Sequence, residues 1–207
     1  MTPQEIEALF TRADGSFLCA RWGRPIVPVV FGIEDATLPV VKGAIEAVVA
    51  LAGHRMAETD PELGANLMVF FFRDWAELPQ VPNLDRLVPG LTGLCGRLEA
   101  EGANQYRAFR FDPDGAIRAA FVFLRMDDHL SAVPAETLAL AQAVQIILLW
   151  SDRAFAAGAP LVRAGEAVML RPDIAGLIRA AYDPVLPAMT QDRSHALRLA
   201  ARSGLLR

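Results

Sequence analysis

The sequence predicts an α+β fold, in which a mixed four-stranded sheet contains an antiparallel hairpin and is packed by helices. The clearest observation is the turn DPDG at 112–115 between the strand-like runs 105–111 and 116–124. Proline followed by Asp-Gly between two such runs is typical of a hairpin. The second observation is the continuous apolar run at 66–72, which is typical of a central strand covered on both faces. The third is the helical spacing of apolar residues over 37–54.

The N-terminal part of the chain is expected to hold one helix and one strand. A helix is predicted over 2–10, because Thr2 can cap its first turn and Pro3 occupies the first helical position. A linker leads to PIVPVVFG at 25–32, whose β-branched residues predict a strand. Its two prolines favour an edge of the sheet or the start of the strand.

The middle of the chain adds three helical segments. Thr37 is expected to begin the first of them and Gly53 to end it. Asp74 can cap a short turn, and a less regular helical pattern covers 84–102. A third apolar helix is predicted to run from Pro134 to about Trp150.

The C-terminal part is predicted to be a loop followed by two helices. The loop contains Gly158 and Pro160, and the helix PDIAGLIRAAY covers 172–182. The tail from 191 to 206 is amphipathic, and its apolar side is expected to carry Leu197, Leu199 and Leu205.

The length of 207 residues predicts a single domain. Its expected parts are an N-terminal helix and linker at 1–24, a core at 25–190 and a C-terminal helix at 191–207. The net charge of −4 gives no basic face of the kind that nucleic acid requires, so no nucleic-acid partner is expected. Lys42 is the only lysine, and arginine favours planar contacts to carboxylates or phosphates wherever it is placed to make them.

Targeting signals and cysteines both favour a cytoplasmic protein. The N-terminus lacks a basic region followed by an apolar one, so no signal peptide is expected. The longest apolar run, AVQIILLW, is too short to cross a bilayer, and no membrane partner is expected. Cys19 and Cys95 are predicted to be free, buried thiols, since two cysteines form no disulfide framework.

The stretch AQAVQIILLWSD at 141–152 resembles the active-site helix of zincin metallopeptidases, which reads H-E-x-x-H followed by x-L-G-L. Ala141, Gln142 and Gln145 stand at the positions of the two histidines and the glutamate. The apolar frame follows at 147–149, where L-G-L would lie. The resemblance implies a zincin-like fold in which every metal ligand of this motif is replaced.

Two segments also resemble a bacterial domain family of unknown function. Its helix reads roughly E-E-x-x-Q-x-L-G-L-x-x-D, and the matching residues here are Gln145, Ile147, Leu149 and Asp152. The family then ends in a leucine-rich helix and Y-D-P-x-L-x-P-G-M-T, which is similar to LIRAAYDPVLPAMT at 177–190. Ala188 stands near the expected glycine.

The first functional hypothesis is a non-catalytic binding or interaction domain that uses no cofactor and no metal. Its ligand, an unknown small molecule or a protein, would lie in a cleft bordered by the hairpin and the 134–150 helix. The candidate ligand-binding residues are Gln142, Gln145, Asp152 and Tyr182. A buried glutamine must find partners, so Gln142 and Gln145 are expected to bond the hairpin backbone or a nearby loop, unless they orient a ligand.

The second hypothesis is a metal-assisted hydrolase that uses Asp127, Asp128 and His129. These residues form the densest polar cluster, just past the second hairpin strand, and could bind a hard cation or act as acid and base. The alternative is a solvated strand end that starts the next helix. A third hypothesis is a subunit of an oligomeric assembly, such as a homodimer, with the tail helix docking on its partner.

Three other sets of residues are weaker candidates. The loop 53–64 holds His54, Glu58, Asp60 and Glu62, but its spacing fits no calcium-loop pattern, so a solvated connection is expected. The histidines His54, His129 and His195 are far apart in sequence and do not predict a zinc site. Arg107 and Arg110 point to opposite faces of one strand and cannot share a phosphate.

Overall fold

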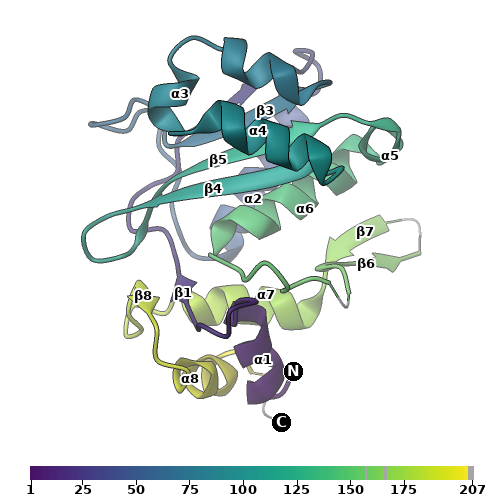
Figure 1. Ribbon diagram of the computed structural model, residues 1–207. Helices are drawn as coiled ribbons and strands as arrows, with labels where there is room; N and C mark the ends of the chain where they lie inside the picture. The colour runs from purple at the N-terminus through teal and green to yellow at the C-terminus, as the bar shows by residue number, and fades with distance from the viewer. Residues whose placement is uncertain (157, 166, 205–207) are drawn as a thin grey trace.

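A computed structural model describes residues 1–156, 158–165 and 167–204, and its central feature is a four-stranded mixed sheet (Figure 1). The strand order is β2-β3-β5-β4. Strands β2, β3 and β5 run parallel, and β4 runs antiparallel to β5. Their bounds are Pro28–Phe31 for β2, Leu67–Phe72 for β3, Gln105–Phe111 for β4 and Ile117–Arg125 for β5. The prediction of a mixed four-stranded sheet with an antiparallel hairpin is therefore confirmed.

Helices cover both faces of this sheet, and two apolar cores result (Figure 1). One face is covered by the 3-10 helix η1 (Trp75–Gln80), α3 (Leu84–Leu87) and α4 (Leu91–Ala100). The other is covered by α2 (Leu38–Leu51) and α6 (Ala135–Ile147). Alternation along β3 supplies both cores, since Val69 joins the α2–α6 side and Phe70 and Phe72 join the other.

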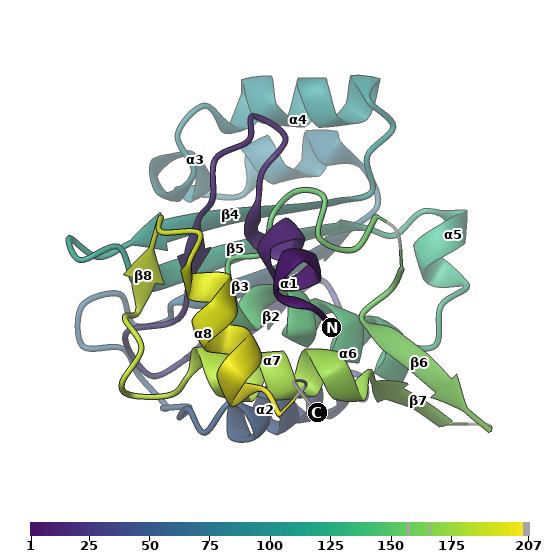
Figure 2. The same cartoon turned by 90° about the horizontal axis from the view of Figure 1, so that it is seen from below.

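A further layer lies beyond α2 and α6, and both ends of the chain contribute to it (Figure 2). It contains α1 (Pro3–Phe10), α7 (Pro172–Ala181) and α8 (His195–Arg202). The short strand β1 (Cys19–Ala20) pairs antiparallel with β8 (Met189–Thr190) and so joins the two terminal segments. The remaining elements are α5 (Asp128–Ser131), β6 (Leu161–Ala164) and β7 (Ala167–Leu170).

Several local predictions are confirmed. Thr2 forms a reciprocal capping box with Glu5 at the start of α1, and Asp74 does the same with Glu77 at the start of η1. Strand β2 lies at an edge of the sheet, and β3 lies between β2 and β5. Gly32 ends β2 at a φ of +79°, where a Cβ atom would lie 1.9 Å from the Phe71 carbonyl oxygen, so only glycine fits.

The predicted end of the third helix is wrong. Helix α6 ends at Ile147, and Leu148 has extended backbone angles instead of continuing to Trp150. Leu148 forms a β-bridge with Arg21, and the Leu149 N–H donates to the Ala20 carbonyl oxygen over 2.9 Å. Backbone pairing with the N-terminal segment therefore replaces the helical hydrogen bonds that the apolar pattern predicts for residues 148–150.

Two C-terminal predictions also need correction. The segment expected to be a loop contains the antiparallel hairpin of β6 and β7. In α8, Leu199 is buried but Leu197 is 58% exposed, because the buried side of the helix is formed by residues 195, 196, 199 and 200. Leu205 lies outside the described residues.

The cysteine prediction is confirmed, since Cys19 and Cys95 are free and buried. Burial raises the pKa of the Cys19 thiol to about 12. Among the residues that the structure describes, none of the helices is both long and apolar enough to cross a membrane.

Candidate binding cleft along strand β4

A cleft of about 830 Å³ runs along strand β4, on the side of the sheet that ends with this strand. Its other walls are the loop at 12–14, the C-terminal end of α6 at Gln145 and the segment 149–155. It therefore lies between the hairpin and the helix that the sequence hypothesis named, with the N-terminal loop as a third wall. The volume is in the range of small-molecule sites.

The position of β4 determines which side chains reach the cleft. β4 pairs with β5, and among the described strands it has no partner on its other edge. Its residues alternate, so Arg107 faces α6 whereas Tyr106 and Ala108 pack into the core beneath α4. Arg110 lies on that second face too, donating to the Leu87 carbonyl oxygen over 3.0 Å. The prediction that Arg107 and Arg110 point to opposite faces is confirmed.

Arg107 is held by two glutamines at the inner wall of the cleft. Its Nη2 donates to Gln142 Oε1 over 2.7 Å and to Gln105 Oε1 over 2.9 Å. Gln142 Nε2 donates to the same Gln105 oxygen over 3.0 Å, which closes a triangle of side chains. Gln142 is only 7% exposed, so this pairing satisfies an amide that would otherwise be costly to bury.

The charge of Arg107 is not matched by a carboxylate. No described aspartate or glutamate lies within ion-pair distance of its guanidinium, and its buried Nε donates to none of the described residues. Burial lowers the pKa of Arg107 to about 10, since the cation loses hydration without gaining a counter-ion. At neutral pH the cleft therefore contains a positive charge held only by neutral oxygens.

Trp150, Phe155 and Phe109 give the cleft an aromatic wall. Trp150 stacks on Phe10 with ring centroids 5.2 Å apart and meets Phe155 edge-on at 5.1 Å. Its Nε1 donates to the Val144 carbonyl oxygen over 2.8 Å. These contacts fix the indole plane, and Trp150 is only 9% exposed, so the half-buried Phe109 and Phe155 add accessible ring surface to the lining.

Two aspartates lie in the lining, and both bond the N-terminal loop. Asp152 Oδ1 accepts from the Ala13 N–H over 3.1 Å. Asp14 Oδ1 accepts from the Ser16 hydroxyl over 2.6 Å and from its N–H over 2.8 Å. The Ser16 hydrogen bonds lower the pKa of Asp14. These carboxylates therefore hold the N-terminal loop in place as a wall of the cleft.

The four candidate ligand-binding residues have different positions. Gln145 and Asp152 line the cleft, and Gln142 lies behind Arg107. Tyr182 has a structural place instead, because its hydroxyl donates to the Ile147 carbonyl oxygen over 2.8 Å and accepts from the Trp22 N–H over 3.3 Å. Burial raises the pKa of Tyr182, so its hydroxyl stays protonated.

The polar cluster past β5 has the geometry of a helix start. Asp127 Oδ1 accepts from the Leu130 N–H over 2.9 Å and caps α5, and its Oδ2 accepts from Asn104 Nδ2 over 3.0 Å. The Leu130 hydrogen bond lowers the pKa of Asp127. The side chains of Asp128 and His129 are exposed. This arrangement supports the helix-start alternative and gives the hydrolase hypothesis no assembled site.

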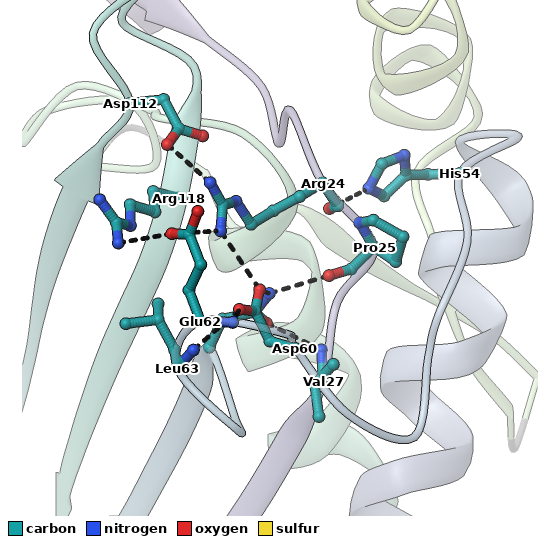
Figure 3. Close-up of polar contacts among 10 residues, drawn as sticks. Arg24, Pro25, Val27, His54, Asp60, Glu62, Leu63, Asp112 and Arg118 are labelled. Atoms are coloured by element: carbon teal, nitrogen blue, oxygen red, sulfur yellow. Dashed lines mark hydrogen bonds and ion pairs between the residues drawn. The ribbon is translucent and has the colours of Figure 1, made fainter.

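Most residues of the loop 53–64 are exposed, as expected of a solvated connection, but Asp60 is only 4% exposed. It belongs to a cluster of ion pairs (Figure 3). Arg24 reaches three carboxylates, with Nη distances of 3.4 Å to Asp60, 3.3 Å to Glu62 and 2.8 Å to Asp112. Arg118 donates to Glu62 over 2.7 Å. This Arg24 cluster ties the loop before β3 to the turn of the β4–β5 hairpin.

Asp60 is the buried centre of the Arg24 cluster. Its Oδ1 accepts from the N–H groups of Glu62 and Leu63, each over 2.9 Å. Its Oδ2 accepts from Asn66 Nδ2 over 3.1 Å. Burial opposes ionisation, but these hydrogen bonds outweigh it and hold the pKa of Asp60 below its usual value.

The histidines are spread over three regions. His54 Nε2 lies 2.9 Å from the Arg24 carbonyl oxygen, His129 is in α5 and His195 is buried in α8. Across the part of the chain that the structure describes, no three histidine, cysteine, aspartate or glutamate side chains gather so that they could hold a metal ion.

Sequence reasoning missed three features of the cleft: the inward charge of Arg107, the indole of Trp150 and the loop at 12–14. The available signal was the alternation QYRAFRF, which places Gln105 and Arg107 on one face together. It could have been combined with Gln142 on the following helix. Nothing local in the sequence places the N-terminal loop beside β4.

Comparisons of this chain with models of protein families, with curated proteins and with solved structures found no match.

Proposed function

We propose that this protein is a non-catalytic binding protein that holds a small molecule in the cleft along β4. The cleft itself is the observation that carries this proposal, because it combines an aromatic wall with a half-buried arginine, Arg107, that has only amide partners. A concave site with a few convergent polar groups is the usual form of a small-molecule site. Its described lining contains no histidine or cysteine, and both of its aspartates accept backbone hydrogen bonds from the N-terminal loop.

We further propose that the layout is zincin-like. Three features support this: the order strand, helix, strand, hairpin and helix, with η1, α3 and α4 inserted before the hairpin and α5 after it; the antiparallel edge strand β4; and the position of α6 beside that strand. The positions of the motif's ligands carry Ala141, Gln142 and Gln145. In such layouts the edge of the sheet borders the cleft, and function must still be argued from the site itself.

Ligand-observed NMR with a library of small aromatic and polar fragments would test the binding function. We expect fragments that compete with one another for one site and that change the fluorescence of Trp150. The change should persist in Trp75→Phe, whose indole lies in the core under α4, and vanish in Trp150→Phe. Fragments that bind only at scattered, non-competing positions would overturn the proposal.

A further inference from the structure

We propose that the ligand of the β4 cleft carries a single carboxylate, which pairs with Arg107, on an aromatic body that lies against Trp150. This inference rests on the proposed binding function and names the chemical class of the ligand.

First, Arg107 lacks a counter-ion among the described residues. Arg107 is half-buried, and a cation that has lost part of its hydration is stabilised when an anion pairs with it. Arg24 shows the ordinary solution in this molecule, with three carboxylates around one guanidinium. Arg107 has two amide oxygens instead, so its charge is oriented but not neutralised. A ligand anion would supply the charge that the fold does not.

The second step is the supply of free donors. All described hydrogen bonds of the Arg107 guanidinium leave from Nη2, so the N–H groups of Nη1 have no described acceptor. Nε also has none, but it is buried, so Nη1 is the donor that a ligand would reach. The two glutamines fix the plane of the guanidinium while Arg107 lines the cleft. A carboxylate oxygen forms a short, charge-assisted hydrogen bond with a guanidinium N–H of this kind.

The third step is the charge of the remaining lining, which favours a monoanion over a phosphate dianion. Arg12 is a second cation in the wall, but Asp14 and Asp152 lie in the same lining. Arg110 also borders the cleft, but its Nη2 bonds the Leu87 carbonyl oxygen on the other face of the sheet. The described lining thus carries three arginines and two aspartates, a net charge of +1, which matches a monoanion better than a dianion.

The fourth step is the apolar surface available to the rest of the ligand. Phe109, Leu149, Trp150 and Phe155 line the cleft together. The ring of Trp150 is held by its stack on Phe10 and by its bond to Val144. A rigid aromatic surface of this kind favours a flat, apolar body.

Isothermal titration calorimetry of the wild-type chain with three naphthalene probes would test this inference. The probes are 2-naphthoate, its neutral partner 2-naphthamide and the dianionic 2-naphthyl phosphate. We expect 2-naphthoate to bind about tenfold or more tighter than 2-naphthamide, since a hydrogen bond to a charged group adds a factor of this size. We expect 2-naphthyl phosphate to bind more weakly than 2-naphthoate.

Variants would show which residue causes the preference for 2-naphthoate over 2-naphthamide. Arg107→Gln should lower the affinity for 2-naphthoate to that of 2-naphthamide, and Arg107→Lys should retain part of the preference. The matched control is Arg97→Gln, an exposed arginine of α4 that does not line the cleft, and this variant should leave both affinities unchanged. Circular dichroism and thermal melting would establish that each variant is folded.

The outcomes separate this inference from the function on which it rests. Equal binding of 2-naphthoate and 2-naphthamide in the cleft would overturn the carboxylate class but leave a small-molecule site. Tighter binding of the phosphate would replace the class with phosphate esters. If no probe bound to the wild-type chain, both the inference and the proposed cleft function would be contradicted.

Discussion

Two arginines in this molecule are placed in opposite ways. Arg24 sits among Asp60, Glu62 and Asp112 and joins a loop to the hairpin turn (Figure 3). Arg107 sits on the adjacent strand of that same hairpin but has only glutamine partners. Both have a buried Nε without a partner, so the difference lies in the carboxylates.

The difference shows how charge can separate a structural role from a binding role. In the Arg24 cluster, every charge has an opposite charge within ion-pair distance. Removing one member leaves its partners with fewer opposite charges and therefore destabilises the fold. At Arg107 the folded state already contains a partly dehydrated cation without a carboxylate partner. Replacing Arg107 should therefore affect stability little and binding strongly.

The largest effect is expected for Asp60→Ala. Its removal leaves Asn66 and two backbone N–H groups without their acceptor and takes one of three carboxylates from Arg24, so the free energy of unfolding should fall by about 3 kcal/mol. The matched control is Glu62→Ala, whose side chain is 58% exposed and should cost less than about 1 kcal/mol. Urea denaturation measures both, and equal losses would mean that burial of Asp60 does not matter.

An intermediate effect is expected when the two arginines are replaced by methionine. Arg24→Met leaves the buried Asp60 without its cation and should cost about 2 kcal/mol. Arg107→Met removes an unmatched cation and frees only one glutamine oxygen, so its change should stay within about 1 kcal/mol. A large loss in Arg107→Met, by the same denaturation experiment, would show that Arg107 is structural.

The smallest effect concerns pH. Burial, with the nearby Arg21 and Arg55 cations, lowers the pKa of His54 below 6.5. The unfolded chain then binds the proton more readily, so stability is complete above pH 6.5 and falls as pH drops toward 5. One proton sets a limit of about 1.4 kcal/mol per pH unit. Denaturation at pH 7, 6 and 5 should show a shallower slope in His54→Gln, and an unchanged slope would assign the loss elsewhere.

Much of the fold could be predicted because its signals are local. The DPDG turn specifies the hairpin, and an unbroken apolar run specifies the central strand β3. The end of α6 could not be predicted, because Leu148 leaves the helix to pair with Arg21 from the other end of the chain. The β6–β7 hairpin was missed because it carries no strong turn sequence.

The candidate site was predictable only in part. Gln145 and Asp152 line the cleft, since they follow from the helix and the segment after it. Strand alternation predicts which face Arg107 occupies, but it does not predict whether a carboxylate lies within ion-pair distance of it. That depends on which side chains α6 and the N-terminal loop present, and these elements are distant in sequence.

The most direct test of carboxylate binding by Arg107 is a crystal structure of the protein soaked with 2-naphthoate. We expect the naphthalene ring against Trp150 and the carboxylate within hydrogen-bond distance of the Arg107 guanidinium. The same soak of Arg107→Gln should lose that placement. A carboxylate that avoids Arg107 in the wild-type crystal, or a cleft without ligand density at millimolar probe, would contradict the account.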